Sequence, residues 1–249
     1  MNTEVWVDCN VHVESLTCPQ AALSRARDAS VCCVATGVSP DQWAFLSKVR
    51  GVHRAYGLHP LSAVVPNEWL SSLNQYLTAD PSAAIGEIGL DFRRGSPETS
   101  GQIERCRQQL ELALTLDRPV ILHAVKAHHV LYPLLKEMGI HRFMVHAFNG
   151  SADVAERYLD LGGWLSLGGM ATWHPVPKGL SVFAQMPLDR VLLETDAPDL
   201  PIQGKDAGEP SDLPEVGHAL AVLRGLSDQA VAQQTRRNAE AFFGVDFAL

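Results

Sequence analysis

Residues 118–123 read RPVILH and residues 142–146 read RFMVH, so two short apolar runs each end in a histidine. Three more runs carry or end in a group that can bind a metal ion: VWVDCNVH at residues 5–12, AAIGEIG at 83–89 and RVLLETD at 190–196. One such run would mean little. Five runs predict a shared site at the carboxyl ends of parallel strands, which is where a (β/α)8 barrel holds its chemistry.

Eight β-rich apolar runs recur along the chain, at residues 5–11, 31–36, 53–58, 83–88, 119–123, 142–146, 163–167 and 190–195. They are nearly continuous rather than alternating, as expected for a parallel sheet that is covered on both faces. Helical spacing of apolar residues marks segments between and after them, notably residues 103–116, 131–138, 154–161 and 227–243. The sequence therefore predicts an α/β fold, a single-domain (β/α)8 TIM barrel over residues 1–249. Residues 198–214, the longest irregular stretch, are expected to form an active-site loop.

The composition indicates an ordinary soluble protein, with 46% hydrophobic and 19% charged residues. No apolar stretch approaches the ~20 residues that span a bilayer, and the N-terminus does not resemble a signal peptide, so we expect a cytoplasmic location. The net charge of −8 argues against passive coating of DNA, because Lys and Arg supply that kind of affinity. An enzyme that handles phosphate with metal ions and a few local cations stays compatible with this charge.

The first strand carries an incomplete metal-binding pair. Side chains alternate along a strand, so Asp8, Asn10 and His12 are expected on one face. Two ligands at this spacing can chelate one ion, but only His12 is a strong ligand. The amide oxygen of Asn10 binds zinc-like ions much more weakly than imidazole does.

Glu87 lies between small residues in an apolar run, where a buried carboxylate needs a partner. One or two metal ions are the simplest partner, and a salt bridge inside the barrel is the alternative. His123 and His146 end neighbouring strands and are expected side by side. Asp196 ends the eighth strand and would face His12 across the closed barrel, where it could bind a metal and accept a proton from water.

Cations near these strand ends could contact an anionic substrate. Arg93 and Arg94 follow the run of Glu87, and Lys126 follows His123, although a solvated surface role for the lysine is equally compatible. His59 ends the third strand and could line the pocket without being a ligand. Trp173 could stack on a base, but a packing role is favoured.

Several motifs together resemble the TatD-type metal-dependent hydrolases, a family of amidohydrolase-like TIM barrels. They are GLHP at 57–60, IGEIGLDF at 85–92, RPVILHAVKAH at 118–128, VHAFNGS at 145–151 and ETDAP at 194–198. TRRNAEAFFG at 235–244 resembles the C-terminal helix of that family, so the likeness runs from about residue 5 to residue 244. It implies a phosphoesterase, usually a deoxyribonuclease, that uses one or two divalent ions such as Zn, Mg or Mn.

The resemblance also implies a role for each strand-end group. Glu87 would bridge two ions, with His123 and His146 on one of them and His12 and Asp196 on the other. Metal ions at such a site polarise a phosphoryl oxygen and activate water, and Asp196 would take the proton of that water. The serines and cysteines show no sequence signal of a base that would activate them, so a covalent mechanism is disfavoured.

The chain departs from the family in its first strand. The family has the pattern D-x-H-x-H there, whereas residues 8–12 of this chain read DCNVH. Asn10 therefore replaces a strong ligand, while Glu87, His123 and His146 are all present. We expect unequal sites, with one ion bound readily and the other weakly or only with substrate.

Three functions stay open at this stage. The first is a phosphodiesterase acting on DNA, most naturally single-stranded, with Lys126 where the family has a basic residue near the scissile phosphate. The second is hydrolysis of an amide or ester, such as a lactone or an aminoacyl ester, because the same metals polarise carbonyls. The third is an accessory or binding protein that has lost turnover with the histidine. The expected partners are DNA or a small phosphoester or ester, without a membrane, for a monomer or weak oligomer.

Overall fold

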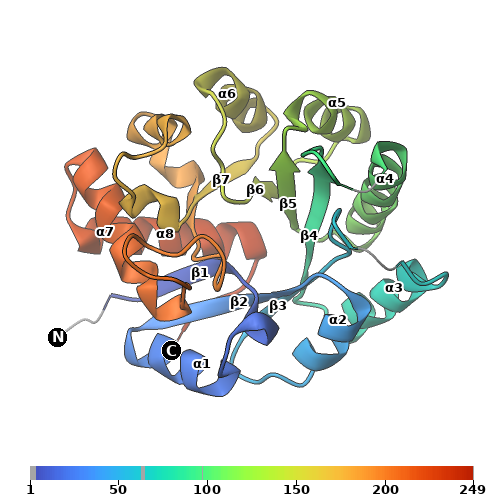
Figure 1. Ribbon diagram of the computed structural model, residues 1–249, viewed down its shortest axis with the longest axis horizontal. Coiled ribbons are helices and arrows are strands. Elements are labelled where there is room, and N and C mark those ends of the chain that lie inside the picture. The colour runs from blue at the N-terminus through green and yellow to red at the C-terminus, as the bar shows by residue number, and fades with distance from the viewer. Residues whose placement is uncertain (1–3, 63–64, 97, 249) are drawn as a thin grey trace.

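The computed structural model describes residues 4–62, 65–96 and 98–248 of the chain. Eight parallel strands lie side by side in chain order and form the centre of the molecule (Figure 1). They are β1 Trp6–Val11, β2 Val31–Gly37, β3 His53–Tyr56, β4 Ala84–Asp91, β5 Val120–Val125, β6 Phe143–Val145, β7 Trp164–Leu167 and β8 Val191–Leu193. The predicted (β/α)8 barrel is confirmed.

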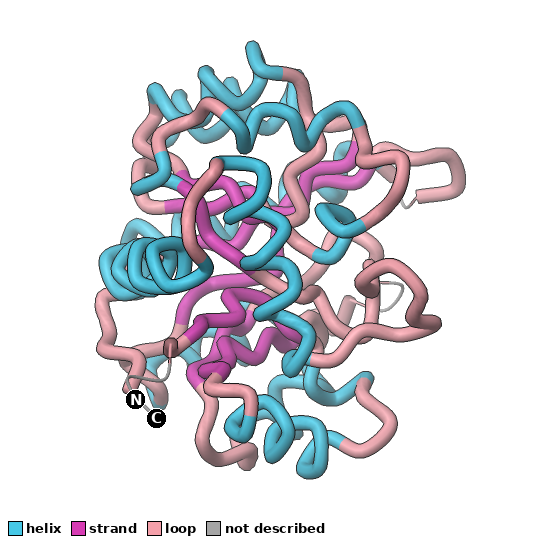
Figure 2. Tube along the Cα trace, turned by 90° about the vertical axis from the view of Figure 1, so that its left-hand side faces the viewer, coloured by secondary structure: helices cyan, strands magenta, loops and turns pink. Residues whose placement is uncertain are grey.

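Helices surround the strands on the outside, as Figures 1 and 2 show. They are α1 Pro19–Asp28, α2 Pro40–Leu46, α3 Trp69–Ala79, α4 Thr99–Leu116, α5 His128–Met138, α6 Ala152–Asp160, α7 Leu213–Arg224 and α8 Asp228–Phe243. Short 3-10 segments are η1 Val13–Ser15, η2 Gly169–Thr172, η3 Lys178–Ala184, η4 Leu188–Arg190 and η5 Pro210–Asp212. Between β7 and β8 the described chain has only such segments, and α7 and α8 both follow β8. None of the described helices is both long and apolar enough to cross a membrane.

The local sequence determines where the last helix, α8, begins and ends. Ser227 caps α8 by accepting a hydrogen bond from the backbone N–H of Ala230 at 3.2 Å. Val231 and Phe242 lie on its buried face, and Gly244 ends the helix in the left-handed conformation, with φ +69°. The predicted helix of residues 227–243 is confirmed, with residue 227 as its cap.

The barrel interior is filled by one apolar cluster to which every strand contributes. Its buried members are Val7, Cys9, Val34, Ala55, Ala84, Ile121, Met144, Leu192, Ala239, Phe242, Phe243 and Phe247, and Trp164 packs against them partly buried. The aromatic residues at the end of α8 and just after it close this cluster. The carboxyl ends of the strands are left for polar groups.

Asp8 joins β1 to β8, where the barrel closes. Its Oδ1 accepts the backbone N–H of Thr195 at 2.9 Å, and its Oδ2 accepts the Thr195 hydroxyl at 2.5 Å. Two backbone bonds continue the closure, from Asp196 N–H to the Asn10 carbonyl at 3.0 Å and from His12 N–H to the Ala197 carbonyl at 2.9 Å. Burial raises the pKa of Asp8 to about 8, although the bonds from Thr195 act in the opposite direction. The closure brings His12 and Asp196 to the same point of the barrel rim.

Three details of the sequence prediction were wrong. Strand β4 runs through Asp91, three residues beyond the end of the predicted run of residues 83–88. Residues 213 and 214 belong to α7 rather than to the loop after β8. Asp8 does not share a face with Asn10 and His12, because the register between β1 and β2 shifts between Asp8 and Val11.

Replacing Asp8 by alanine should lower the free energy of unfolding by about 2–4 kcal/mol, because two buried donors of Thr195 lose their acceptor. Urea unfolding followed by circular dichroism measures this. Asp160→Ala, on the exposed end of α6, is the matched control and should change stability by less than about 0.5 kcal/mol. A stability of Asp8→Ala equal to that of the control would contradict the role of Asp8 in barrel closure.

Candidate metal centre

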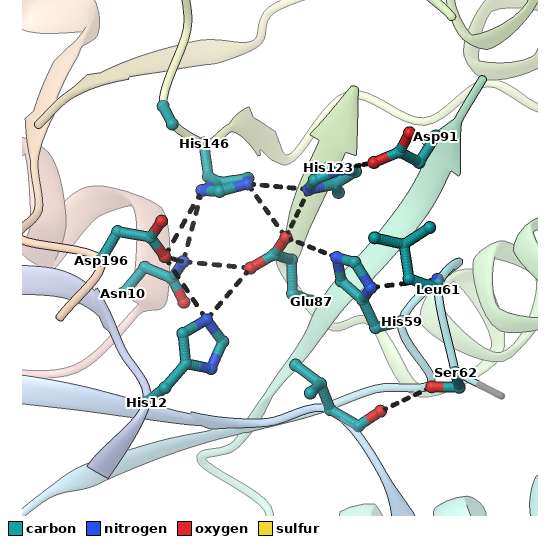
Figure 3. Close-up of polar contacts among 12 residues, drawn as sticks. Asn10, His12, His59, Leu61, Ser62, Glu87, Asp91, His123, His146 and Asp196 are labelled. Carbon is teal, nitrogen blue, oxygen red and sulfur yellow. Dashed lines mark hydrogen bonds and ion pairs between the residues drawn. The ribbon is translucent and has the colours of Figure 1, made fainter. Parts of the chain in front are cut away.

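The carboxylate of Glu87 lies at the centre of a group of histidines (Figure 3). Its Oε1 is 2.8 Å from Nδ1 of His123, 2.9 Å from Nε2 of His146 and 3.2 Å from Nε2 of His59. Its Oε2 is 3.6 Å from Nε2 of His12. Glu87 is only 2% exposed, so the chain places a buried carboxylate among four imidazoles.

These groups come from six parts of the sheet. His12 follows β1, His59 follows β3, Glu87 lies in β4, His123 lies in β5, His146 follows β6 and Asp196 lies beyond β8. All six line one pocket of about 730 Å³. The structure therefore brings together the five strand-end groups that the sequence singled out, and adds His59 to them.

Two glycines allow β4 and β5 to approach closely enough for this arrangement. A Cβ on Gly86 would lie 2.5 Å from Cβ of Ile121, and a Cβ on Gly89 would lie 2.1 Å from the carbonyl oxygen of His123. Gly89 also has φ +135°, which other residues rarely adopt. The structure thus explains why glycine stands at positions 86 and 89. A side chain at either position would push β4 away from β5 and separate Glu87 from His123.

Two overlapping sets of donor atoms could hold a cation. One is His59, Glu87 and His123, and the other is His12, Glu87 and Asp196; within each set the ligand atoms lie within 4.8 Å of one another. His146 lies between them, with Nε2 3.1 Å from Nδ1 of His123 and Nδ1 3.9 Å from Oδ1 of Asp196. Imidazole nitrogens and carboxylate oxygens are the ligands that zinc and similar divalent ions take in proteins.

The electrostatics of the site favour positive charge. Burial by itself would raise the pKa of Glu87, but the charge of His146 and the bonds from His12 and His123 hold it well below its usual range. Burial lowers the pKa of His12, but its bonds to Asp196 and Glu87 outweigh this and raise it well above the usual value. The pKa of His146 is raised well above its usual value in the same way, by Glu87 and Glu194 against the effect of burial. The carboxylates raise the pKa of the neighbouring histidines strongly, so the site stabilises positive charge. A donor set of this kind fits a divalent cation.

Asn10 lies inside the His12 and Asp196 half of the site. Its Nδ2 donates to Oε2 of Glu87 at 3.2 Å and to Oδ1 of Asp196 at 3.1 Å. The same nitrogen is 3.4 Å from Nδ1 of His146. Its buried Oδ1 has no hydrogen-bond partner in the part of the chain that the structure describes. The substituted position is thus in contact with both carboxylates that would hold the second ion.

One ring nitrogen of His59 accepts a hydrogen bond from the backbone. The backbone N–H of Leu61 donates to its Nδ1 at 3.1 Å (Figure 3). Burial lowers the pKa of His59, so the ring tends to be neutral and carries its proton on Nε2. This Nε2–H faces Glu87, which makes His59 a hydrogen-bond donor to the carboxylate as long as the Leu61 bond is kept.

Two buried carboxylates behind the histidines were missed in the sequence. Oδ2 of Asp91 lies 2.9 Å from Nε2 of His123. Oε1 of Glu194 accepts the backbone N–H of Ala147 at 2.5 Å and lies 3.6 Å from Nδ1 of His146. Each acid stands in the same strand-end motif as a predicted ligand, four residues after Glu87 or two before Asp196, and that signal could have identified them.

The cations near the pocket differ in their partners. Lys126 lines the pocket, and no ion pair involves it among the described residues. Arg93 also lines the pocket, but its guanidinium pairs with Asp91. Arg94 is exposed and is not part of the pocket lining. Trp173 lies outside the pocket lining as well, and its indole N–H donates to the Pro201 carbonyl at 2.8 Å, which supports packing.

Comparison with known proteins identifies the family of the chain. The family model for TatD related DNase matches residues 7–244. The metal-dependent hydrolase YjjV of Escherichia coli, itself uncharacterised, is 34% identical over 238 residues, which cover 91% of this chain and 92% of YjjV. The 3'-5' ssDNA/RNA exonuclease TatD of Pantoea ananatis is 31% identical over 249 residues, which cover 91% of this chain and 93% of that protein.

The solved structures show the same relationship. The crystal structure of Escherichia coli YjjV superposes with a TM-score of 0.91 at 32% sequence identity, covering 98% of this chain and 100% of YjjV. A TatD family hydrolase from Entamoeba histolytica has a TM-score of 0.83 at 18% identity, over 96% of this chain and 98% of that one, which supports the fold. The chain therefore belongs to the TatD related DNase family of metal-dependent hydrolases.

Proposed function

We propose that this hydrolase is a phosphodiesterase that cleaves single-stranded DNA from an end with the help of divalent metal ions. The observation that supports this most is the set of histidines and carboxylates around Glu87 at the floor of the pocket. The family model and the TatD exonuclease of Pantoea ananatis favour nucleic acid as the substrate. Because Glu87 is 2% exposed, a scissile phosphate must enter the pocket, which a free strand end can do more readily than a paired duplex.

The proposed ligands divide into two half-sites that share Glu87. His123 and His146 would hold one ion with Glu87, and their facing nitrogens are 3.1 Å apart. His12 and Asp196 would hold the other ion, and Nε2 of His12 lies 3.4 Å from Oδ1 of Asp196. The second half-site is the one that contains the amide of Asn10, so we propose that it binds its ion more weakly.

The side chains then have distinct tasks in hydrolysis. A bound divalent ion supplies Lewis acidity toward the phosphoryl oxygen and lowers the pKa of the attacking water. Asp196, which lines the pocket, accepts the proton of that water. Lys126 contacts the phosphate of the substrate, and Arg93 adds positive charge beside it. The Nε2–H of His59 fixes the orientation of Glu87.

The location and the assembly of the protein are predicted from the sequence alone. A cytoplasmic location and a monomeric or weakly oligomeric state stay predictions. The net charge of −8 is compatible with a DNA substrate if the ions and Lys126 provide the local positive charge.

Replacing Asp196 by asparagine should reduce cleavage of labelled single-stranded DNA by about 100-fold or more, because the proton acceptor and a metal ligand are both lost. Metal-reconstituted protein is assayed with the DNA and, in parallel, with a generic ester. Asp206→Asn, at an exposed position in the same loop, is the matched control and should keep full activity. Turnover of the ester alone would favour the amide or ester hydrolase instead. Absence of any activity that depends on Asp196 would favour an accessory protein.

Metal content tests the weak half-site separately. After sequential chelation, the native protein should retain about one ion per chain, and Asn10→His should retain about two, because imidazole replaces the amide between Glu87 and Asp196. Elemental analysis measures the ions. Asn74→His, on the exposed face of α3, controls for an added histidine and should retain about one ion. Two equally tight ions in the native protein, or no gain in Asn10→His, would contradict the proposal.

A further inference from the structure

His123 has a carboxylate at each of its two ring nitrogens. Nδ1 lies 2.8 Å from Oε1 of Glu87, and Nε2 lies 2.9 Å from Oδ2 of Asp91 (Figure 3). The side chain is only 9% exposed, and Nδ1 also lies 3.1 Å from Nε2 of His146. A neutral imidazole carries one proton and can bind a metal only through the other nitrogen. The ligand atom of His123 therefore depends on which carboxylate retains the proton.

Asp91 is held as a rigid acceptor. Its side chain is fully buried, and Nε of Arg93 donates to its two oxygens at 2.9 and 2.7 Å while Nη2 of Arg93 pairs with Oδ2. The hydroxyl of Ser96 and the backbone N–H of Arg93 also donate to Oδ1, at 3.1 and 3.0 Å. Its backbone is fixed to the side chain of Gln102 by bonds of 2.8 and 2.9 Å. Glu87, in contrast, faces the pocket and several competing donors.

We propose that Asp91 is a positioning residue that retains the Nε2 proton of His123, so that His123 offers Nδ1 to the metal ion beside Glu87. Arg93 is the second positioning residue, because it holds Asp91 in place. The proposal rests on the metal centre of the proposed function, but it is independent of the substrate. Metal-binding histidines commonly donate their other N–H to a carboxylate, which fixes the ring and its ligand nitrogen.

The position of His146 supports this assignment. Its Nε2 faces Glu87 at 2.9 Å, while its Nδ1 faces Glu194 at 3.6 Å. His123 and His146 therefore offer opposite ring nitrogens to the same region, and these nitrogens are 3.1 Å apart. Two nitrogens bound to one tetrahedral zinc ion at about 2.0–2.1 Å would be about 3.3 Å apart, so the pair fits one ion.

The pairing with Asp91 changes the effect that a substitution of Arg93 is expected to have. Half of its side chain is exposed at the pocket, which suggests a contact with substrate, yet its Nε and Nη2 are both committed to Asp91. A residue that only touched the phosphate would affect substrate binding and leave metal affinity unchanged. A residue that orients Asp91 must affect metal affinity in the absence of any substrate.

The test uses the full chain and Zn²⁺ alone. Asp91→Asn should weaken Zn²⁺ binding by about 10- to 100-fold in competition with a chromophoric chelator, because a neutral amide is a weaker acceptor for the Nε2–H of His123. Arg93→Gln keeps the carboxylate of Asp91 but removes the guanidinium that holds it. This variant should also weaken Zn²⁺ binding, by a smaller factor. Asp41→Asn, exposed in the first turn of α2, is the control and should bind as the native protein does.

Nitrogen-15 NMR of histidine-labelled, zinc-loaded protein reads the tautomer directly. The resonance that disappears in His123→Gln should show a protonated Nε2 and a zinc-bound Nδ1 in the native protein, and this Nε2–H should exchange faster in Asp91→Asn. Zinc bound to Nε2 of His123 would overturn the proposal. So would Zn²⁺ affinity in both Asp91→Asn and Arg93→Gln within about twofold of the control. Neither readout requires DNA cleavage, so a failure of the proposed substrate would leave this result interpretable.

Discussion

The structure of the site depends on the burial of one carboxylate. Glu87 is 2% exposed at the mouth of an apolar barrel, and a charge in that position is costly unless opposite charges surround it. The chain supplies His12, His123 and His146 from three other parts of the sheet, with nitrogens 2.8–3.6 Å from its oxygens. Because those histidines must be deprotonated to bind a metal, protons and a divalent cation compete for the same place. In this TatD related hydrolase the divalent cation can therefore take the place of the protons that offset the charge of Glu87.

Barrel closure determines which groups can reach Glu87. The bonds between Asp8 and Thr195 join the first strand to the last and place His12 against Asp196. Without that closure the second half-site would be divided between two edges of an open sheet. The amide of Asn10 contacts Oε2 of Glu87 and Oδ1 of Asp196 and lies 3.4 Å from His146. Nδ1 of His123 lies 2.8 Å from the other oxygen of Glu87, Oε1. We propose that one complete half-site beside one altered half-site is what distinguishes this chain from the family pattern that its first strand resembles.

Most of the fold and the membership of the site could be predicted from the sequence, because a parallel barrel places all strand ends at one rim. The apolar runs marked the strands to within a few residues, and the polar group at each run marked the side chains that line the pocket. The pairing of Arg93 with Asp91 could not be predicted, because an arginine after a strand looks the same whether it faces solvent or folds back on the strand. The ring orientation of His59 depends on a backbone N–H two residues later, and the face of Asp8 depends on a register shift in β1. Such features depend on backbone and side-chain geometry at the scale of a few ångströms, which residue patterns do not encode.

The central claim is that a divalent cation binds at the carboxylate of Glu87. Anomalous diffraction from crystals grown with Mn²⁺ or Zn²⁺ tests it most directly. The strongest anomalous peak should lie within about 2.0–2.3 Å of an oxygen of Glu87 and of a histidine nitrogen. A well-occupied metal elsewhere in the molecule, with the carboxylate of Glu87 bound only to its histidines, would contradict the account.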